Sequence, residues 1–196
     1  MEQVQLEMED LELSSDTMEV EDDYSDIRLR RLELSDIDHL LEWFRDEKVS
    51  KFCLTDCFTS KEAATKFVAN VAIPHQWYAV ICLKDKPIGS ISVTPFSGNE
   101  QCRGEIGYVL ASKYWSKGIA TKAVKMVAST IFAEWPHLER LEALVDVENI
   151  GSQRVLEKVG FTKEGVLRKY CLLRGITRDM VMFSLLSTDP QVNYFV

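Results

Sequence analysis

The sequence predicts one α/β domain in which a mixed, twisted β-sheet is flanked by helices. Apolar runs of strand length alternate with helix-like patterns from residue 27 onward. The order strand, long helix, strand is clearest between residues 105 and 147. With 196 residues, 46% of them apolar, the chain can bury a sizeable core. These observations favour a single domain without internal repeats.

The first half of the predicted domain combines a strand, two helices and a hairpin. The strand covers Ile27 to Leu32, after which Ser35 and Asp38 resemble a capping box that starts an amphipathic helix. A second helix is expected to begin after Ser60 and to end before Pro74. The strands expected next are Trp77 to Leu83, Pro87 to Thr94 and Gln101 to Leu110, with Lys84-Asp85-Lys86 as the turn between the first two.

The helix after Gly118 has the clearest pattern, because its apolar residues recur at helical spacing until Pro136 stops it. Its apolar stripe comprises Ile119, Ala120, Ala123, Val124, Val127, Ala128, Ile131 and Phe132. A strand from Leu141 to Val147 follows, and then a helix that ends at Gly160-Phe161. Two strands joined near Arg174-Gly175 complete the domain.

Charge is divided unevenly along the chain. Eleven of its 31 acids lie within residues 1–26, which contain no Lys or Arg, so the remaining chain has 23 bases and a net charge of +3. This composition predicts a disordered acidic extension over 1–26, a folded domain over 27–188 and a tail over 189–196. The extension is expected to be solvated, or else to attract a basic partner or compete with phosphates for a binding cleft.

Composition also excludes several classes of protein. No apolar run reaches the length of a membrane span, and the N-terminus has no signal-peptide pattern. Among the five cysteines only Cys53 and Cys57 lie close together, so free thiols are expected and a metal site is not. The weakly basic domain lacks a dense Lys/Arg patch, which disfavours nucleic-acid binding. A cytoplasmic protein is predicted, with the nucleus also open.

Two segments carry most of the functional information. The strand Glu105 to Leu110 leads through Trp115-Ser116-Lys117-Gly118 into the long helix. Gly118 and the small Ala120 let a ligand approach the main chain, and a helix N-terminus attracts anions. A phosphate cradle is therefore predicted over Lys117 to Thr121.

The second segment, from Asn149 to Phe161, follows the next apolar strand. Together, YWSKGIATKAV and VDVENIGSQRVLEKVGFTKEGVLRKY resemble the GNAT superfamily of acetyl-CoA-dependent N-acetyltransferases, and within it the RimJ/RimL-like branch. Known members of that branch acetylate protein N-termini or, in relatives, small amines. The resemblance covers residues 27 to 187.

The resemblance implies a GNAT-like sheet whose strands ending near Leu110 and Val147 splay apart to form an acetyl-CoA cleft. The pantetheine arm would pair with the main chain of the first strand. Acetyl-CoA is implied as co-substrate, without a metal. The residues implied in its binding are Val109, Leu110, Lys117, Gly118, Ile119, Ala120, Thr121 and Asn149, the last of which is also a helix start.

Two positions in the cradle depart from the superfamily pattern. Trp115 stands where Arg or Gln is usual, and Ser116 stands where Gly is usual. Trp115 is typical of the RimJ/RimL-like branch, and main-chain amides rather than side chains would hold the anion. Trp115 is also expected to cover the sheet edge.

The implied reaction is direct attack of a neutral amine on the thioester carbonyl, with a backbone N–H near Val109 or Leu110 stabilising the oxyanion. Glu105 is the expected base. Many GNAT enzymes use a tyrosine as the general acid where this chain has Leu156, whereas RimL-like enzymes use a serine, which matches Ser152. Tyr170 and water are the alternative acids, and Cys171 replaces an acidic residue of RimL-like enzymes.

The acceptor is less constrained than the cofactor. A protein or peptide α-amine is the first expectation, because an α-amine at pH 7.5 is roughly one-third neutral and a lysine amine only about 0.1%. A small amine such as a polyamine is the alternative substrate. A non-catalytic acetyl-CoA sensor is the alternative from another class. The oligomeric state, monomer or homodimer, is left open.

Overall fold

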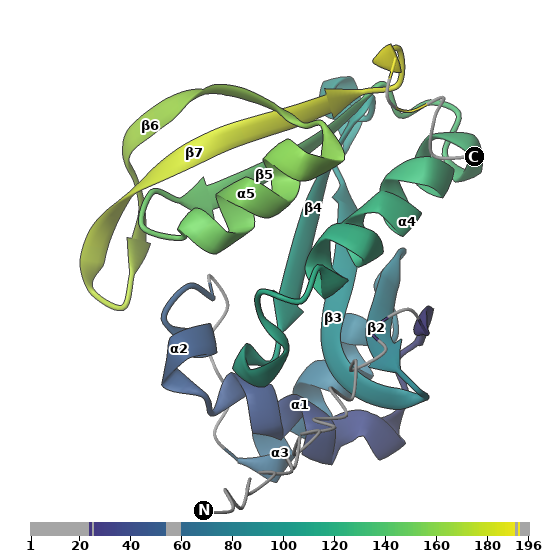
Figure 1. Cartoon of the computed structure of the whole chain (residues 1–196), viewed down its shortest axis with the longest axis vertical. Coiled ribbons are helices and arrows are strands. Elements are labelled where there is room, and N and C mark those ends of the chain that lie inside the picture. The colour runs from purple at the N-terminus through teal and green to yellow at the C-terminus, as the bar shows by residue number, and fades with distance from the viewer. Residues whose placement is uncertain (1–23, 25, 54–59, 191, 193–196) are drawn as a thin grey trace, which may run out of the picture.

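A computed structural model of the chain describes residue 24, residues 26–53 and 60–190, and residue 192. It contains a seven-stranded sheet in the order β1-β2-β3-β4-β5-β7-β6 (Figure 1). β4 and β5 are parallel, and the other described neighbours are antiparallel. The mixed sheet predicted from the sequence is therefore confirmed. Most of the predicted extension over 1–26 and of the tail over 189–196 lies outside the described residues.

The strands lie close to their predicted positions. Their bounds are β1 Ile27–Arg31, β2 Tyr78–Leu83, β3 Lys86–Pro95, β4 Arg103–Leu110, β5 Arg140–Asp146, β6 Thr162–Leu173 and β7 Ile176–Leu186. The β2–β3 turn is shorter than expected, because Lys86 already belongs to β3. Lys84 and Asp85 have φ angles of 48° and 65°, the positive values that a tight two-residue hairpin turn requires.

The α-helices are α1 Ile37–Phe44, α2 Glu47–Ser50, α3 Lys61–Phe67, α4 Ile119–Glu134 and α5 Ile150–Val159. α3 continues into a π-helical turn over Val68–Ala72, and 3₁₀ turns cover Leu34–Asp36, Gly98–Glu100 and Ser112–Tyr114. The expected helix start at Ser60 is confirmed, since its side chain accepts a hydrogen bond from the N–H of Ala63. Among the described residues, no helix combines the length and the apolar character needed to cross a membrane.

The capping box predicted at Ser35 and Asp38 is wrong. The carboxylate that caps this segment belongs to Asp36, which accepts a hydrogen bond of 2.9 Å from the N–H of Glu33. Asp36 is buried and is also held by two hydrogen bonds from Arg30, whereas Asp38 forms an exposed ion pair with Lys61. The helical segment begins with the 3₁₀ turn Leu34–Asp36, whose N-cap is Glu33, two residues before the expected cap at Ser35. The capping pair is therefore Glu33 and Asp36, not Ser35 and Asp38.

Two hydrophobic clusters cover opposite faces of the sheet. α4 and α5 pack on one face, through residues such as Ile131 and Leu156. α1 and α3 pack on the other face and only against its N-terminal half, through residues such as Leu40 and Ala64. Figure 1 shows α4 and α5 in front of the sheet and α1, α2 and α3 beside its lower part. A ligand that passes between strands of the sheet would therefore meet α4 and α5 on one face and the α1–α3 segment on the other.

β4 and β5 diverge in the middle of the sheet. Their parallel pairing covers three register pairs and ends at Glu105 with Glu142. Beyond this point, residues 106–110 of β4 and 143–146 of β5 have no pairing with each other. The splayed central strands expected from the family resemblance are thus present.

Candidate active site

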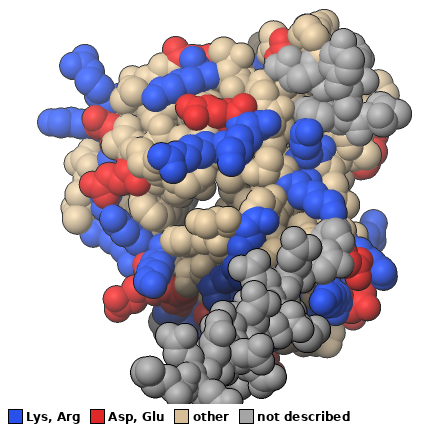
Figure 2. Space-filling model, in the orientation of Figure 1, with Lys and Arg blue, Asp and Glu red and all other residues tan. Residues whose placement is uncertain are grey.

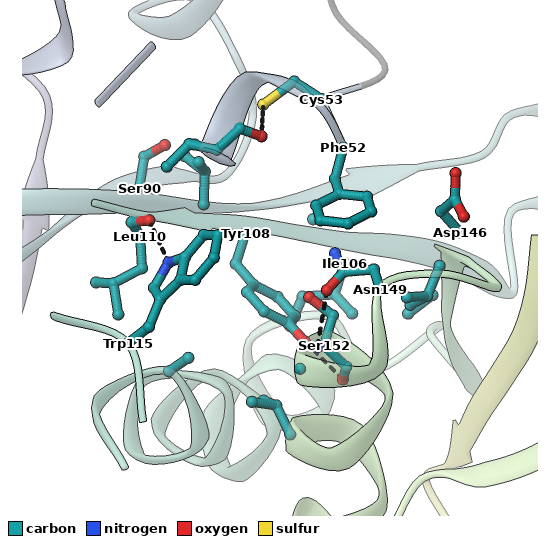
Figure 3. A pocket seen from close by; sticks show the side chains of 18 of the residues that line it. Phe52, Cys53, Ser90, Ile106, Tyr108, Leu110, Trp115, Asp146, Asn149 and Ser152 are labelled. Carbon is teal, nitrogen blue, oxygen red and sulfur yellow. Dashed lines mark hydrogen bonds between the residues drawn. The ribbon is translucent and has the colours of Figure 1, made fainter. Parts of the chain in front are cut away.

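A cavity of about 830 Å³ occupies the gap between the diverging strands. Its walls come from β3, β4 and β5, from the first turns of α4 and α5, and from the segments around α1, α2 and α3. Because the gap lies within the sheet, the cavity connects the two faces. Figure 3 shows Phe52 and Cys53 on one side of the strands and Tyr108 and Ser152 on the other.

The main chain of β4 alternates between its two neighbours. In the β3–β4 pairing, Phe96 donates to the carbonyl of Arg103 and Ala111 donates to that of Ile88, which places the odd-numbered residues of β4 in hydrogen-bonded pairs with β3. The even-numbered residues Ile106, Tyr108 and Leu110 therefore direct their N–H and C=O groups toward the gap. Beyond Glu105 these groups have no strand partner on β5, so they are the ones available to the amides of a ligand.

The two strand residues predicted to bind the cofactor therefore differ in position. Leu110 directs its carbonyl away from β3, where it accepts a hydrogen bond of 2.8 Å from the indole N–H of Trp115. The carbonyl of Val109 lies next to Gly89 on β3, and the side chain of Val109 lines the cavity from the α1–α3 face. Ile106 and Tyr108 were not among the residues expected to bind the cofactor. Their main-chain groups face the gap, whereas those of Val109, which was expected to bind it, face β3.

The predicted phosphate cradle lies at one end of the cavity. Lys117, Gly118, Ile119, Ala120 and Thr121 all line it. Gly118 is the N-cap of α4 and has a φ of +77°, a left-handed conformation that suits glycine. The first N–H groups of a helix have no partner within it, so this turn offers donors to an anion.

The two departures from the superfamily pattern have separate structural effects. Trp115 is 40% exposed, and its hydrogen bond to Leu110 ties the loop before α4 to the end of β4. Because β4 is an inner strand, this contact is not the expected cover of a sheet edge. Ser116 has a φ of +61°, which few residues other than glycine adopt readily. The glycine that is usual at this position adopts a positive φ without strain, whereas Ser116 adopts it with strain.

Charges that line the cavity are separated by sign. The cavity-lining bases are Lys117, Arg154 and Lys158, which lie beside α4 and on α5. The cavity-lining acids are Glu105, Asp146 and Glu148, on the splayed strands and the turn after β5. The basic end is thus suited to phosphates. At the other end Arg178 pairs with Asp146 and Glu148, and Lys51 also pairs with Glu148, so Glu105 is the carboxylate best suited to a cationic amine.

Aromatic and hydroxyl side chains line the cavity on the α1–α3 face. Phe44 and Phe67 lie edge to face with ring centroids 6.5 Å apart, and Phe67 and Tyr78 do so at 6.3 Å. The hydroxyl of Tyr78 donates a hydrogen bond of 3.0 Å to Ser90, and burial raises the pKa of Tyr78. We call this region the acceptor chamber. Its lining is Phe44, Val49, Phe52, Cys53, Phe67, Tyr78, Ser90, Ser92, Thr94, Glu105 and Asp146.

Glu105 lies in this chamber at the last paired position of β4. Strand alternation gives Glu105, Gly107 and Val109 the same face, and Val109 packs against the α1–α3 cluster. Burial is the main cause that raises the pKa of Glu105, and the negative charge of Glu142, its register partner, raises it further. A carboxylate with a raised pKa binds a proton more readily, so Glu105 is suited to the role of base.

The first turn of α5 carries two more of the predicted residues. Asn149 is the N-cap, and its side-chain oxygen accepts a hydrogen bond of 3.1 Å from the N–H of Ser152. The hydroxyl of Tyr108 donates a hydrogen bond of 3.1 Å to the carbonyl of Ser152 (Figure 3). Ser152 thus lines the cavity with its main chain fixed from two directions. Its role as general acid and the cofactor contact of Asn149 stay predictions.

Tyr170 lies apart from the other predicted residues. It does not line the cavity; its side chain is 53% exposed on β6, beside a shallow depression that includes Lys169 and Asp179. The strand is irregular here, because its register with β7 shifts between Leu167 and Cys171. The structure therefore brings Glu105 and Ser152 to one cavity and leaves Tyr170 outside it.

Sequence reasoning missed Tyr108, Arg154, Lys158, Asp146 and the acceptor chamber. Arg154 and Lys158 follow Ser152 at spacings of two and six residues, near one helix face, but an exposed base on a helix is usually only solvated. Asp146 ends an apolar strand, and its burial depends on the pairing of β5 with β7. The sequence did offer one signal for Asp146, because a charged residue stood at the end of a strand that was expected to splay.

Comparison with known proteins identifies the class of enzyme that this fold and cleft define. Residues 26–162 match the acetyltransferase (GNAT) domain family. The chain belongs to this family and is an N-acetyltransferase.

Three relatives illustrate the similarity. The chain is 31% identical to the uncharacterized N-acetyltransferase p20 of Bacillus licheniformis, over 83% of this chain and 94% of that protein. A GNAT acetyltransferase from Bacillus anthracis superposes with a TM-score of 0.75 at 26% identity, over 83% of this chain and 96% of the other. The ribosomal-protein-S5-alanine acetyltransferase of Vibrio fischeri superposes with a TM-score of 0.72 at 25% identity, over 83% and 94%.

Proposed function

We propose that the protein transfers an acetyl group from acetyl-CoA to the α-amine of a peptide or protein. The observation that carries this proposal is a single cavity through the sheet with bases at one end and carboxylates at the other. The relative from Vibrio fischeri acts on the alanine of ribosomal protein S5, which supports a protein N-terminus as the acceptor.

The basic end of the cavity would hold acetyl-CoA. The first turn of α4 donates N–H groups to the pyrophosphate, and Lys117 adds a positive charge. The pantetheine amides pair with the main-chain groups of Ile106 and Tyr108 and with the N–H of Leu110, whose carbonyl already accepts a hydrogen bond from Trp115. This arrangement brings the thioester to the middle of the splay, next to the acceptor chamber.

The reaction would then proceed by direct transfer. Glu105 receives a proton from the acceptor's ammonium group, directly or through water, and the amine nitrogen attacks the thioester carbonyl. A free N–H of β4 stabilises the oxyanion. As the carbon–sulfur bond breaks, the nitrogen loses its second proton, which passes through Ser152 or water to the coenzyme A thiolate. Among the carboxylates of the chamber, Asp146 is paired with Arg178, so Glu105 is the one that favours a cationic acceptor. The aromatic rings suit an apolar side chain beside the amine.

Release of coenzyme A thiol from acetyl-CoA tests the proposal. The panel contains peptides with different free N-termini, the same peptides with blocked N-termini and an internal lysine, and polyamines. Release with free α-amines alone supports the proposal, and release with polyamines alone assigns the protein to small amines. If acetyl-CoA binds but no amine leads to release of the thiol, the protein is better described as a sensor that does not turn the cofactor over.

Two substitutions test the assigned residues within the same assay. Ser152→Ala removes the hydroxyl and keeps the main chain that Asn149 and Tyr108 hold. Glu105→Gln keeps the shape of the side chain and removes the base. Unchanged turnover in either variant refutes the role given to that residue.

A further inference from the structure

We propose that the acidic N-terminal segment, residues 1–26, binds the basic surface at the phosphate end of the cavity and competes there with acetyl-CoA. This inference rests on the proposed function, because it takes the cradle at Lys117 to be the cofactor's phosphate site. It adds a regulatory occupant to that site, and the occupant is a segment of the same chain.

A contact between Tyr24 and Lys117 carries the inference. The Lys117 ammonium lies 4.4 Å from the centroid of the Tyr24 ring, within cation–π range, and also donates a hydrogen bond to the Tyr24 hydroxyl. Tyr24 is partly buried and packs against the larger hydrophobic cluster. The end of the acidic segment is therefore anchored on a residue that lines the cradle.

Covalent geometry brings negative charge to the same place. Asp23 and Asp22 directly precede Tyr24, and consecutive Cα atoms are about 3.8 Å apart. Chain connectivity alone therefore keeps the Cα atoms of Asp23 and Asp22 within about 4 and 8 Å of that of Tyr24. Nine further acids belong to the segment, which contains no Lys or Arg of its own. Of these nine, Asp26 pairs with Arg28, just beyond the segment.

The surface around the cradle has the complementary charge. We define the basic surface by Lys117, by the exposed bases of α4, Lys122 and Lys125, and by those of α5, Arg154 and Lys158. Figure 2 shows Lys and Arg side chains gathered on the face that α4 and α5 cover. The acids on these two helices are Glu134 and Glu157, so the basic surface keeps a net positive charge.

The chain from residue 1 to Tyr24 is long enough to reach the whole basic surface. Twenty-three residues span up to about 80 Å when extended, whereas the 16 residues of α4 span about 24 Å. Both the segment and the phosphates of acetyl-CoA are anionic, so each weakens the binding of the other at this surface. Exposed charges interact over about 10 Å at 0.1 M salt and over about 3 Å at 1 M, so competition must fade as salt rises.

Calorimetric titration of the full-length protein with acetyl-CoA at 20 mM and 500 mM NaCl tests the inference. One variant neutralises the acids nearest the anchor, through Glu19→Gln, Glu21→Gln, Asp22→Asn and Asp23→Asn. The matched control neutralises four distant acids, through Glu2→Gln, Glu7→Gln, Glu9→Gln and Asp10→Asn, and so changes the net charge equally. A third variant, Tyr24→Ala, removes the anchor without changing any charge.

At low salt the near variant and Tyr24→Ala are expected to bind acetyl-CoA about three- to tenfold more tightly than wild type, because each exposed charge contributes modestly. The distant control changes affinity less, and all proteins converge at high salt. Equal affinities at low salt, or equal gains in the near and distant variants, overturn the inference while leaving the proposed function intact. Failure of every protein to bind acetyl-CoA overturns the proposed function, and the inference with it.

Discussion

At the scale of single residues, the chemistry depends on how Glu105 is surrounded. Its register partner Glu142 is 3% exposed and is held by Arg140 at 2.7 Å and by Arg103 at 3.3 Å. The two arginines hold Glu142 at its position beside Glu105, where its negative charge is one of the two causes that raise the pKa of Glu105. Glu142 thus tunes the proposed base without touching the reacting atoms.

The substitution Glu105→Gln is expected to change stability and activity in different ways. Burial and Glu142 raise the pKa of Glu105, so the protonated form stabilises the fold below the unfolded-state pKa, and this stabilisation is lost as pH rises through the folded-state pKa. Glutamine carries no charge at any pH, so the melting temperature of the variant relative to wild type is expected to increase between pH 4 and pH 8. Its kcat/KM is expected to fall about a hundredfold, within the usual range for loss of a general base.

Thermal melts across this pH range and initial rates with a free α-amine peptide check both parts. A constant difference in melting temperature would show that Glu105 titrates as an ordinary surface carboxylate. Full activity in the variant would remove Glu105 from the mechanism.

Ser116→Gly tests the strain at the cradle. Serine with a φ of +61° costs about 1 kcal/mol or more relative to glycine, so the substitution is expected to raise the free energy of unfolding by about that amount. Ser129→Gly within α4 is the control and is expected to lower stability by about 0.5 kcal/mol, because glycine disfavours a helix interior more than serine does. Chemical denaturation measures both changes, and equal signs for the two variants would contradict this account of Ser116.

Part of the site was predictable because its signals are local. The glycine before a long amphipathic helix indicated the turn that lines the cavity, and a helix start was one of the two roles expected of Asn149. Side chains whose roles depend on strand pairing or register were not predictable in this way. Glu142, Tyr108 and Asp146 look like ordinary strand residues until the register places them. Tyr170 lies outside the cavity, in a part of β6 where the register with β7 shifts.

At the scale of elements, close packing of β3 on β4 fixes one wall of the cavity. A Cβ added at Gly89 would lie 2.3 Å from the carbonyl oxygen of Val109, so only glycine lets the two strands approach this closely. The adjacent residues of β4 supply the main-chain groups that face the gap. The position of this wall therefore depends on a glycine in the neighbouring strand.

Gly89→Ala is expected to displace β4. The clash is with backbone, so the strand must shift, at a cost of about 1–3 kcal/mol in stability and with a raised KM for acetyl-CoA. Gly165→Ala on β6 is the matched control, since no heavy atom lies within 4 Å of the added Cβ, and is expected to change stability by less than about 0.5 kcal/mol. Wild-type values of stability and KM in Gly89→Ala would disprove the constraint.

At the scale of the whole molecule, the sheet separates two binding regions by covering its faces differently. α4 and α5 supply a basic rim on one face, and α1, α2 and α3 enclose an aromatic chamber on the other. The alternation of strands and helices predicted this fold well, because each element had its own periodicity. The division into two chambers was not predictable, because it depends on where β4 and β5 stop pairing.

Two tyrosines test the division into chambers. Tyr108→Phe removes the hydrogen bond to Ser152 on the cofactor side, and Tyr78→Phe removes the bond to Ser90 in the acceptor chamber. Each loss is expected to raise one KM about two- to fivefold, that of acetyl-CoA for Tyr108→Phe and that of the acceptor for Tyr78→Phe. Steady-state kinetics with both substrates varied measures this, and a shift of both constants in both variants would refute separate regions.

The most direct test of the central claim is to locate the transferred acetyl group. A peptide with one free α-amine and one internal lysine is incubated with the protein and acetyl-CoA, and tandem mass spectrometry maps the product. The account predicts acetylation of the α-amine with an unmodified lysine, because the weak base at Glu105 acts on amines that are already partly neutral. Acetylation of the lysine alone, or an unmodified peptide while a polyamine is acetylated, would contradict it.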